Sequence, residues 1–485
     1  MELSRRHFLS GAAVVCGSAV CGCAQNPAGR SALTGFTSVE QDVAVGQREL
    51  PKLLEAFGGA YEDPRLQRYV DGIGKRLAQR SEMPDLPYTF SIANSPVVNA
   101  FALPGGPVTV TRGLITLCDS EAELAGVIGH EIGHVTARHS AERQGQQVLA
   151  TLGMAVLGIA TGSREVAQLA QVGAQAFLSN YSRKQEMEAD TLGARYLDRA
   201  NYDVSAMASF LGTLGDQSRV EARTLGMEGQ IDQFNMMASH PRTVDRVEAA
   251  IAAAEAVRQE KPFLGRDEYL DIIDGILFGD DPKQGIAFGT RFVHPGLRFE
   301  FTVPDGFRIL NSAANVMARD PEGAIIVFDM AKTRSADLRR YVANEWAANA
   351  RVSGVEAFTV NGLPAATGAT RGTVNNQPMD VRFVAIAGEG ASVYRFMFAT
   401  PPGRTASLSE PLRRTSYSFR RLSAAEAARI EPLRLRVVRP PSGATVADLA
   451  QGLPYGRFNA DWFSVLNGLA PGERPQARDR VKVVA

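Results

Sequence analysis

The sequence predicts a multidomain α+β protein: a mostly helical first half with a small sheet, then an α+β sandwich-like module, then a small βααβ unit. At 485 residues the chain is too long for a single core. Apolar residues recur at helical spacing through most of residues 36–258. Residues 289–422 instead alternate β-branched and aromatic runs with turns, which indicates a second module after a linker at 259–288. The C-terminal unit is expected at residues 430–485.

The composition is that of an ordinary soluble protein, with 45% hydrophobic and 21% charged residues. Its 52 basic and 52 acidic residues cancel, so we expect no attraction to nucleic acid. Beyond the N-terminal segment no run of apolar residues is long enough to cross a bilayer, so we expect no membrane-spanning helix in the mature chain.

The N-terminal segment, residues 1–23, has the features of an export signal. A basic start at Arg5 and Arg6 precedes a short run of apolar and small residues. The string "SRRHFL" resembles the twin-arginine export signal, and "VCGC" resembles a lipobox that ends at Cys23. We therefore expect a periplasmic protein anchored to the membrane by a lipid on Cys23. Cleavage near Ala24 without lipidation is the alternative.

In the first half, the patterns of residues 40–58 and 64–81 predict two amphipathic helices. Strands are expected at 88–95 and across 99–117, where "PGG" makes a turn. A further helix over 119–144 is expected to begin at Asp119 or Ser120, because either can cap it and acidic residues fill its first turn.

In the second half, strands are expected at 297–307 and 323–330, a hairpin at 379–400 and a helix at 335–350. This α+β pattern is similar to the Mog-like and PsbP-like sandwiches. The string "FSVLNGLAPGERPQARDRVKVV" near the C-terminus resembles the second half of a LysM domain, a glycan-binding module. The alternative for this unit is a generic small α/β cap.

The stretch "GVIGHEIGHVTARHS" holds three of the six histidines of the chain. Four residues apart on a helix, His130 and His134 project from one face and can take two neighbouring positions around a zinc ion. Glu131 lies about 100° round the helix, where it can accept a proton from a zinc-activated water. This HExxH motif is specific, since chance would produce it only about 0.004 times in such a chain. His139 falls off the ligand face and is expected to bond within the scaffold.

A catalytic zinc ion also needs a third protein ligand and an open position. The string "QEMEAD" places Glu186 and Asp190 on one face of a second helix, with Glu188 rotated off that face. On this pattern alone Glu186 and Glu188 are both candidates.

"HEIGHVTARH", followed about fifty residues later by "SRKQEMEAD", resembles the gluzincin family that includes the CAAX prenyl endopeptidase, HtpX and BepA (metallopeptidase family forty-eight). "NAFALPGG", "GARYL" and "SHPRTVDR" fit the same family, so the resemblance covers roughly residues 38–255. Because no membrane span follows the signal, the resemblance is to a soluble exported branch. The first domain is therefore expected to be an HExxH zincin domain.

The resemblance implies one zinc ion per chain, with His130, His134 and Glu186 as its ligands. It also implies that Glu131 is the base and that Asp190 is a carboxylate that orients a histidine ligand.

Two further sites follow from the family pattern. A histidine before a proline, here His240, comes near the metal in this family, where it can fill the fourth position of a resting enzyme or stabilise the oxyanion. Capping of a helix is the alternative. Gluzincins also hold an extended substrate against an edge strand beside the zinc. Asn99, Ala100 and Phe101 are the candidates for that edge, unless they form only a core strand.

The leading hypothesis is an exported zinc endopeptidase that cleaves cell-envelope polypeptides, including misfolded ones. The alternative is a peptidoglycan-binding or chaperone-like envelope lipoprotein whose zinc site is structural or plugged.

Overall fold

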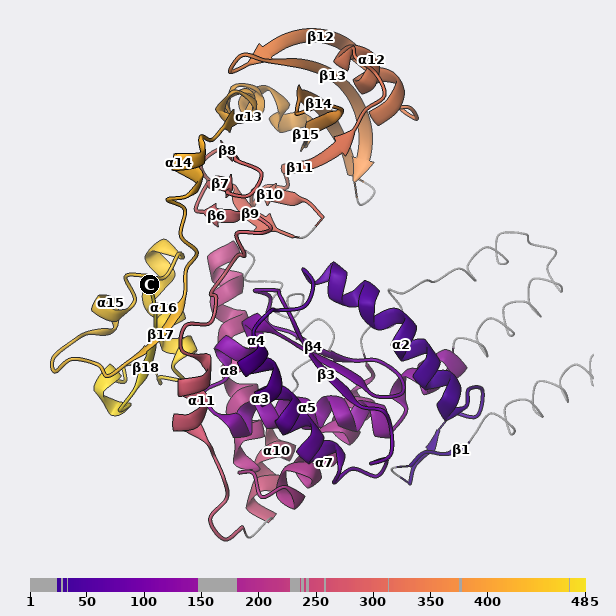
Figure 1. Ribbon diagram of the computed structural model, residues 1–485, viewed down its shortest axis with the longest axis vertical. Coiled ribbons are helices and arrows are strands. Elements are labelled where there is room, and N and C mark those ends of the chain that lie inside the picture. The colour runs from indigo at the N-terminus through magenta and orange to yellow at the C-terminus, as the bar shows by residue number, and fades with distance from the viewer. Residues whose placement is uncertain are drawn as a thin grey trace, which may run out of the picture.

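The computed structural model describes residues 24–27, 29–32, 34–146, 181–226, 236, 240, 244–256, 259–312, 314–374, 377–470 and 472–485. The expected export signal, with Cys23, lies outside these residues. A largely helical region occupies one end of the molecule and a sheet-rich module the other, and the C-terminal unit lies beside the helical region (Figure 1). The predicted mixed α+β, multidomain class is confirmed at this level. None of the helices in the described part of the chain is both long and apolar enough to cross a lipid bilayer.

The helical region surrounds a three-stranded sheet in the order β3-β5-β4. Strand β3 runs parallel to β5, and β4 pairs with β5 in the antiparallel direction, so β4 is an edge. The strands are β3 (Thr89–Ala93), β4 (Ala100–Ala102) and β5 (Pro107–Thr111). The helices are α2 (Val39–Ala56), α3 (Pro64–Ala78), α4 (Arg112–Leu117), α5 (Glu121–Thr136), α7 (Arg183–Arg199), α8 (Ser205–Leu225), α10 (Val244–Ala256) and α11 (Arg266–Ile273).

Local signals explain where the central helices begin. Helix α5 starts as predicted, because the Ser120 side chain accepts a hydrogen bond from the Glu123 N–H. Residues 112–117 were expected to continue a strand, and this is wrong. They form α4, because the Thr111 side chain accepts from the Leu114 N–H and thereby caps a helix directly after β5.

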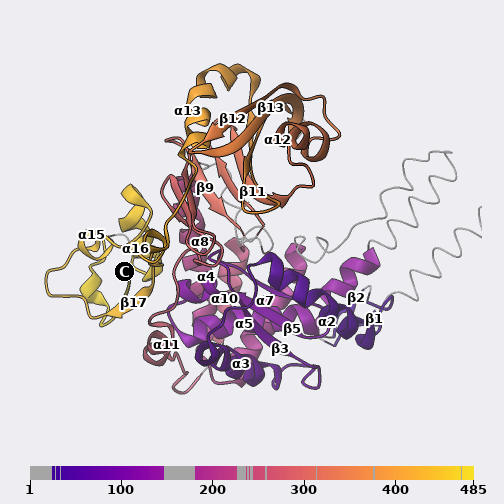
Figure 2. The same ribbon diagram turned by 45° about the horizontal axis from the view of Figure 1, so that its top comes forward.

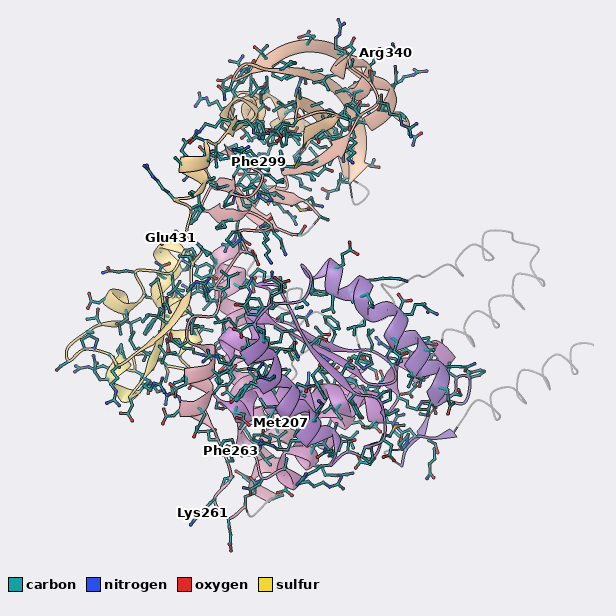
Figure 3. All side chains as sticks on the ribbon, viewed as in Figure 1. Met207, Lys261, Phe263, Phe299, Arg340 and Glu431 are labelled. Carbon is teal, nitrogen blue, oxygen red and sulfur yellow. The ribbon has the colours of Figure 1, made fainter. Side chains whose placement is uncertain are left out.

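The second module contains two sheets that share one aromatic core. Phe299 of the smaller sheet lies 5.3 Å from Phe328 of the larger one, and Phe301 lies 5.0 Å from Phe396, between ring centroids. Helix α13 (Thr405–Ser418) closes this core, and Figure 3 shows Phe299 among the crowded side chains there. The small sheet has the order β16-β8-β7-β6 and the large one β12-β13-β14-β15-β11-β10-β9. The bounds are β6 (Ile286–Phe288), β7 (Arg291–His294), β8 (Phe299–Thr302), β16 (Arg420–Arg421), β9 (Arg308–Asn311), β10 (Val316–Arg319), β11 (Ile325–Lys332), β12 (Ser353–Val360), β13 (Leu363–Val374), β14 (Gln377–Ala387) and β15 (Ser392–Thr400).

The helix expected at 335–350 is shorter and irregular. A single turn, α12 (Leu338–Arg340), runs into a π-helical turn, Tyr341–Trp346. Tyr341 and Val342 are buried against the face of the large sheet opposite the shared aromatic core. Figure 2 shows this segment on the outer side of the module.

The C-terminal unit has the predicted β-α-α-β order, with β17 antiparallel to β18. It does not have a core of its own, because buried residues such as Phe463 and Val481 belong to the same apolar cluster as the helical region. Tyr269, Leu270 and Ile273 of α11 join that cluster, so this part of the segment expected as a linker, 259–288, packs in the core of the helical region. The elements are β17 (Leu435–Val438), α15 (Val446–Leu449), α16 (Asn459–Leu466) and β18 (Val481–Val484).

A buried lysine joins the C-terminal strand to the helical region. The Lys482 ammonium donates to three carbonyl oxygens at the end of α4, those of Thr116, Leu117 and Cys118, at 3.2, 3.1 and 2.8 Å. Burial lowers the pKa of this lysine. The last carbonyls of a helix have no partner within the helix, and a cation is favourable there. Lys482 therefore satisfies the end of α4 immediately before the motif helix begins.

Replacing Lys482 by Met should lower the free energy of unfolding of the full chain by about 1–3 kcal/mol, because buried carbonyls lose their donor. Urea unfolding followed by circular dichroism measures this. Lys283→Met is the matched control, since Lys283 pairs with Glu62 at the surface and its loss should cost about 0.5 kcal/mol or less. Equal free energies of unfolding for the two variants would contradict the stabilising role of the contacts between Lys482 and the end of α4.

Candidate metal centre

The centre is built where α5 and α7 cross without side chains between them. A Cβ on Gly133 would lie 2.9 Å from the backbone oxygen of Ala189, and one on Gly193 would lie 3.0 Å from the backbone nitrogen of His130. The first distance is shorter than real Cβ atoms show, and the second is tighter than nine in ten real Cβ contacts, so glycine at both positions favours this close approach. The close contact brings Glu186, in the first turn of α7, up to the two motif histidines of α5.

Four side chains meet in this space: His130, His134, Glu186 and His240. One donor atom from each lies within 4.8 Å of all the others, and all four residues are buried. From His130 Nε2 the distances are 3.0 Å to His134 Nε2 and 3.3 Å to His240 Nδ1. From Glu186 Oε1 they are 2.9 Å to His240 Nδ1 and 3.4 Å to His134 Nε2.

These separations fit a tetrahedral ion. Zinc–nitrogen and zinc–oxygen bonds of about 2.0–2.1 Å place neighbouring ligand atoms about 3.4 Å apart. Imidazole nitrogens and a carboxylate oxygen are also ligands that zinc accepts. The residues present therefore fit zinc, and His240 Nδ1 is close enough to the other donor atoms to be a fourth ligand.

Charged partners fix the carboxylates around this group. Arg246 of α10 holds Asp190 with two nitrogens, at 2.7 and 2.8 Å, and places a third 2.7 Å from Glu186 Oε2. Asp190 Oδ1 in turn lies 2.8 Å from His130 Nδ1, the ring nitrogen that faces away from the other donors. Burial alone would raise the pKa of Glu186, but His240, His134 and His130 hold it well below its usual range.

Glu131 differs from these carboxylates. It is fully buried, and neither of its oxygens has a hydrogen-bond partner among the described residues. The nearest recorded charged group is His240, whose Nε2 lies 3.6 Å from Glu131 Oε1. A buried carboxylate without a hydrogen-bond partner is costly, so Glu131 calls for an explanation that the described contacts do not supply.

The structure separates the two rivals for the third ligand. Glu186 reaches the donor group, whereas Glu188 points to the stretch 24–32, where its carboxylate contacts Arg30 and Asn26. The predicted substrate strand is also placed. Ala100 and Phe101 lie in edge strand β4, but both are buried, and the Phe101 ring packs 5.1 Å from that of Phe57.

Backbone groups of that edge are still directed outward. The Thr111 N–H donates to the Asn99 carbonyl, and the Leu103 N–H donates to the Pro107 carbonyl. In an antiparallel ladder this alternation turns the backbone groups of Ala100 away from β5. At the end of β4, Ala102 borders the same small cavity as His134, so this end of the strand lies beside the donor group.

Two features of the site were not predicted from the sequence. The guanidinium of Arg246 forms ion pairs with both Asp190 and Glu186. Its position in a helix after the histidine–proline pair gave no signal for this role. Tyr181 also lies in the site, with its ring stacked 3.8 Å from that of His134.

Residues 64–254 match the model of peptidase family M48. The chain contains an M48 peptidase domain. The expected family and zinc cofactor are confirmed by this match together with the donor group. All the metal-centre residues named above lie within the M48 domain.

Curated relatives each match part of the chain. The beta-barrel assembly-enhancing protease of Yersinia pestis is 32% identical over 242 residues, which is 48% of this chain and 48% of that protein. The protein of the same name from Escherichia coli K12 is 31% identical over 195 residues, 38% and 40% of the two chains. Mitochondrial metalloendopeptidase OMA1 of Arabidopsis thaliana is 34% identical over 155 residues, 32% and 31% of the two chains. The chain thus spans at most about half the length of these relatives.

Among solved structures, cyanobacterial PsbP from Synechocystis aligns with 30% of this chain and 98% of its own, at 15% identity. Its TM-score is 0.23, too low to assign a relationship.

Gly133→Ala should force α5 and α7 apart, because the added methyl group meets backbone rather than a movable side chain. Overpacking of this kind costs about 1–3 kcal/mol of folding free energy. Zinc affinity should fall as well, because Glu186 withdraws from the histidines.

Thermal unfolding and zinc titration against a competing chelator measure the two effects. Gly212→Ala in α8 is the control, since a Cβ there meets nothing within 4 Å. It should stabilise the helix by roughly 0.5–1 kcal/mol and leave zinc affinity unchanged. Wild-type zinc affinity in Gly133→Ala would contradict the role of the helix contact.

Proposed function

We propose that this protein is an exported zinc-dependent endopeptidase that hydrolyses polypeptides of the cell envelope. The observation that carries the proposal is the buried, unpartnered Glu131 carboxylate beside the donors of His130, His134 and Glu186. The M48 match and the relatives named as proteases support the reaction class. The export signal expected at residues 1–23 supports the location.

In this mechanism the chain's own residues position the reactants and move the proton. Zinc, when held by His130, His134 and Glu186, supplies a Lewis acid that lowers the pKa of water toward about 7 and polarises the scissile carbonyl. Glu131 accepts the proton of the attacking water, since its carboxylate has no competing partner. It then returns that proton to the leaving amine. Asp190 keeps the His130 ring in its ligating orientation throughout.

The extended substrate is proposed to add to the edge of β4, where the backbone groups of Ala100 that turn away from β5 would pair with it. Asn99 is proposed to assist, because its side-chain oxygen is buried and has no hydrogen-bond partner among the described residues. Ala100 and Phe101 are both buried as whole residues, so this edge has to be uncovered before a substrate can bind there.

His240 is proposed to close the site in the resting protein. Its Nδ1 lies as close to Glu186 and His130 as the other ligands do. The position that it takes is the one that water and substrate need, so His240 has to leave before cleavage.

Two finer proposals concern the location of the protein. A lipid on Cys23 would tether the chain to the membrane. The C-terminal unit would bind peptidoglycan in the manner of a LysM domain, a proposal that its β-α-α-β order supports. A groove between this unit and α8, bordered by Arg219, Thr445 and Gln476 among others, offers room for a glycan.

Glu131→Gln should lower cleavage of casein by roughly 10²–10⁴-fold, the usual contribution of a general base. Zinc content, measured by mass spectrometry, should stay at one ion per chain because Glu131 is not a ligand. The exposed Glu268→Gln is the control and should cleave at the wild-type rate. Undiminished cleavage by Glu131→Gln would rule the mechanism out.

His240→Ala should raise casein cleavage by about tenfold, because a larger fraction of the molecules then has an open site. Zinc should remain bound through the other three ligands. His294→Ala, in the second module, is the control. A His240→Ala protein that holds one zinc ion and cleaves nothing would favour the alternative, an envelope-binding protein with a structural zinc site.

The full chain should be retained on insoluble peptidoglycan and released by soluble N-acetylglucosamine oligomers. The full chain is needed because residues 430–485 share the core of the helical region. Absence of retention would remove the glycan-binding proposal and leave the peptidase proposal intact.

A further inference from the structure

Behind the ligand His134 lies a chain of side chains that the proposed reaction does not use. The Nδ1 atoms of His134 and His139 are 2.8 Å apart, and both residues are buried. His139 Nε2 lies 3.3 Å from Glu188 Oε2. The helical spacing predicted that His139 lies off the ligand face, and the structure shows that its ring contacts the ring of His134 directly.

A left-handed residue brings His139 into this position. Helix α5 ends at Thr136, and Arg138 takes a φ of +53°. This conformation is unusual for a residue with a side chain, so other contacts have to hold it. The Arg138 guanidinium donates to Asp42 Oδ2 at 2.8 Å and to the Thr37 carbonyl at 2.7 Å. The turn returns the chain toward the helix, and His139 comes to lie under His134.

Proton counting fixes the direction of these hydrogen bonds. His134 directs Nε2 toward the other donors, so Nε2 has to be free of a proton to bind zinc. The neutral ring then carries its proton on Nδ1 and donates it to His139 Nδ1. His139 accepts there, so its own proton is on Nε2 and is donated to Glu188. With the opposite direction, His134 would hold its proton on Nε2 and could not bind the ion.

The far end of this chain is held by the segment that follows residue 23. Arg30 forms an ion pair with Glu188, and Asn26 donates to the other oxygen of Glu188 at 3.1 Å. Arg30 also grips Glu142 with two nitrogens, at 3.0 and 2.6 Å. Asn26 is nine-tenths or more buried and donates as well to the Ala137 carbonyl at the end of α5. The described residues of 24–32, which include the paired strands β1 (Ala24–Gln25) and β2 (Ser31–Ala32), are thus tied to the metal centre.

We propose that His139 is a positioning residue that fixes the tautomer and ring orientation of the zinc ligand His134, and that Asn26 and Arg30 anchor it through Glu188. This inference rests on the zinc site proposed above. Outer partners of this kind raise metal affinity without touching the metal, since they remove the cost of orienting the ligand. The N-terminal segment of the mature chain therefore contributes to zinc binding.

The test compares His139→Leu with His139→Asn, two side chains of similar size. Asn keeps an acceptor near the place of Nδ1, whereas Leu has none. Zinc affinity of the full chain, from competition with a chelator of known affinity, should fall by about 10–100-fold in His139→Leu. His139→Asn should recover most of that loss. Thermal unfolding of the zinc-free proteins shows whether both variants are folded.

Arg30→Gln provides a second measurement if His139→Leu does not fold. It should weaken zinc binding by a smaller factor, because Asn26 still holds Glu188. Arg48→Gln is its control, since Arg48 is exposed and pairs only with Glu49 among recorded ion pairs.

Two results would overturn the positioning role: zinc affinity of His139→Leu within about threefold of wild type, or an equal loss in the Leu and Asn variants. Both leave the peptidase proposal standing. A wild-type chain that binds no zinc would overturn the peptidase proposal as well.

Discussion

The metal centre depends on the direct contact between α5 and α7. The HExxH spacing places two imidazoles on one helix, but a carboxylate completes the set only if the second helix lies almost against the first. Gly129 and Gly133 on α5 and Gly193 on α7 remove the side chains that would keep the backbones apart. The Glu186 side chain has a fixed length, so any increase in the distance between α5 and α7 would move its carboxylate away from the zinc position.

The buried carboxylates of the metal centre are energetically costly, and positively charged side chains of the same domain offset part of that cost. Glu131, Glu186 and Asp190 are all buried, and carboxylates in such a place are costly without partners. Arg246 compensates two of them, Glu186 and Asp190, and the third, Glu131, is the proposed base. The domain uses cations in a similar way where its segments meet, since Arg112 donates to the Leu277 and Gly279 carbonyls.

Local patterns predicted much of this arrangement. The start of the motif helix, the pair of motif histidines and the choice of Glu186 over Glu188 all follow from spacing within one helix or from the family pattern. Contacts between distant segments were not predictable in this way. Arg246 looks like any helical arginine until α10 is placed against α7, and His139 was placed by continuing a helix that in fact ends at Thr136.

The same limit applies to the fold. Two strands and the hairpin of the second module and the order of the C-terminal unit were predicted from the sequence, because turns and alternation are local. Strands β12 and β13 and helix α13 of the second module were not predicted. That α11 and β18 complete the core of the first region was not visible, because it depends on pairings across hundreds of residues. Residues 112–117 were mistaken for strand because the helix cap at Thr111 competes with a β-branched run.

One zinc ion is expected to bind four nitrogen or oxygen ligands that come from three separate segments of the chain. X-ray absorption at the zinc edge, on the purified full chain in its resting state, tests it most directly. We expect one zinc ion per chain with four nitrogen or oxygen ligands at about 2.0–2.1 Å and strong scattering from imidazole rings. A chain that holds no zinc, or a six-coordinate shell of oxygens without imidazole, would contradict it.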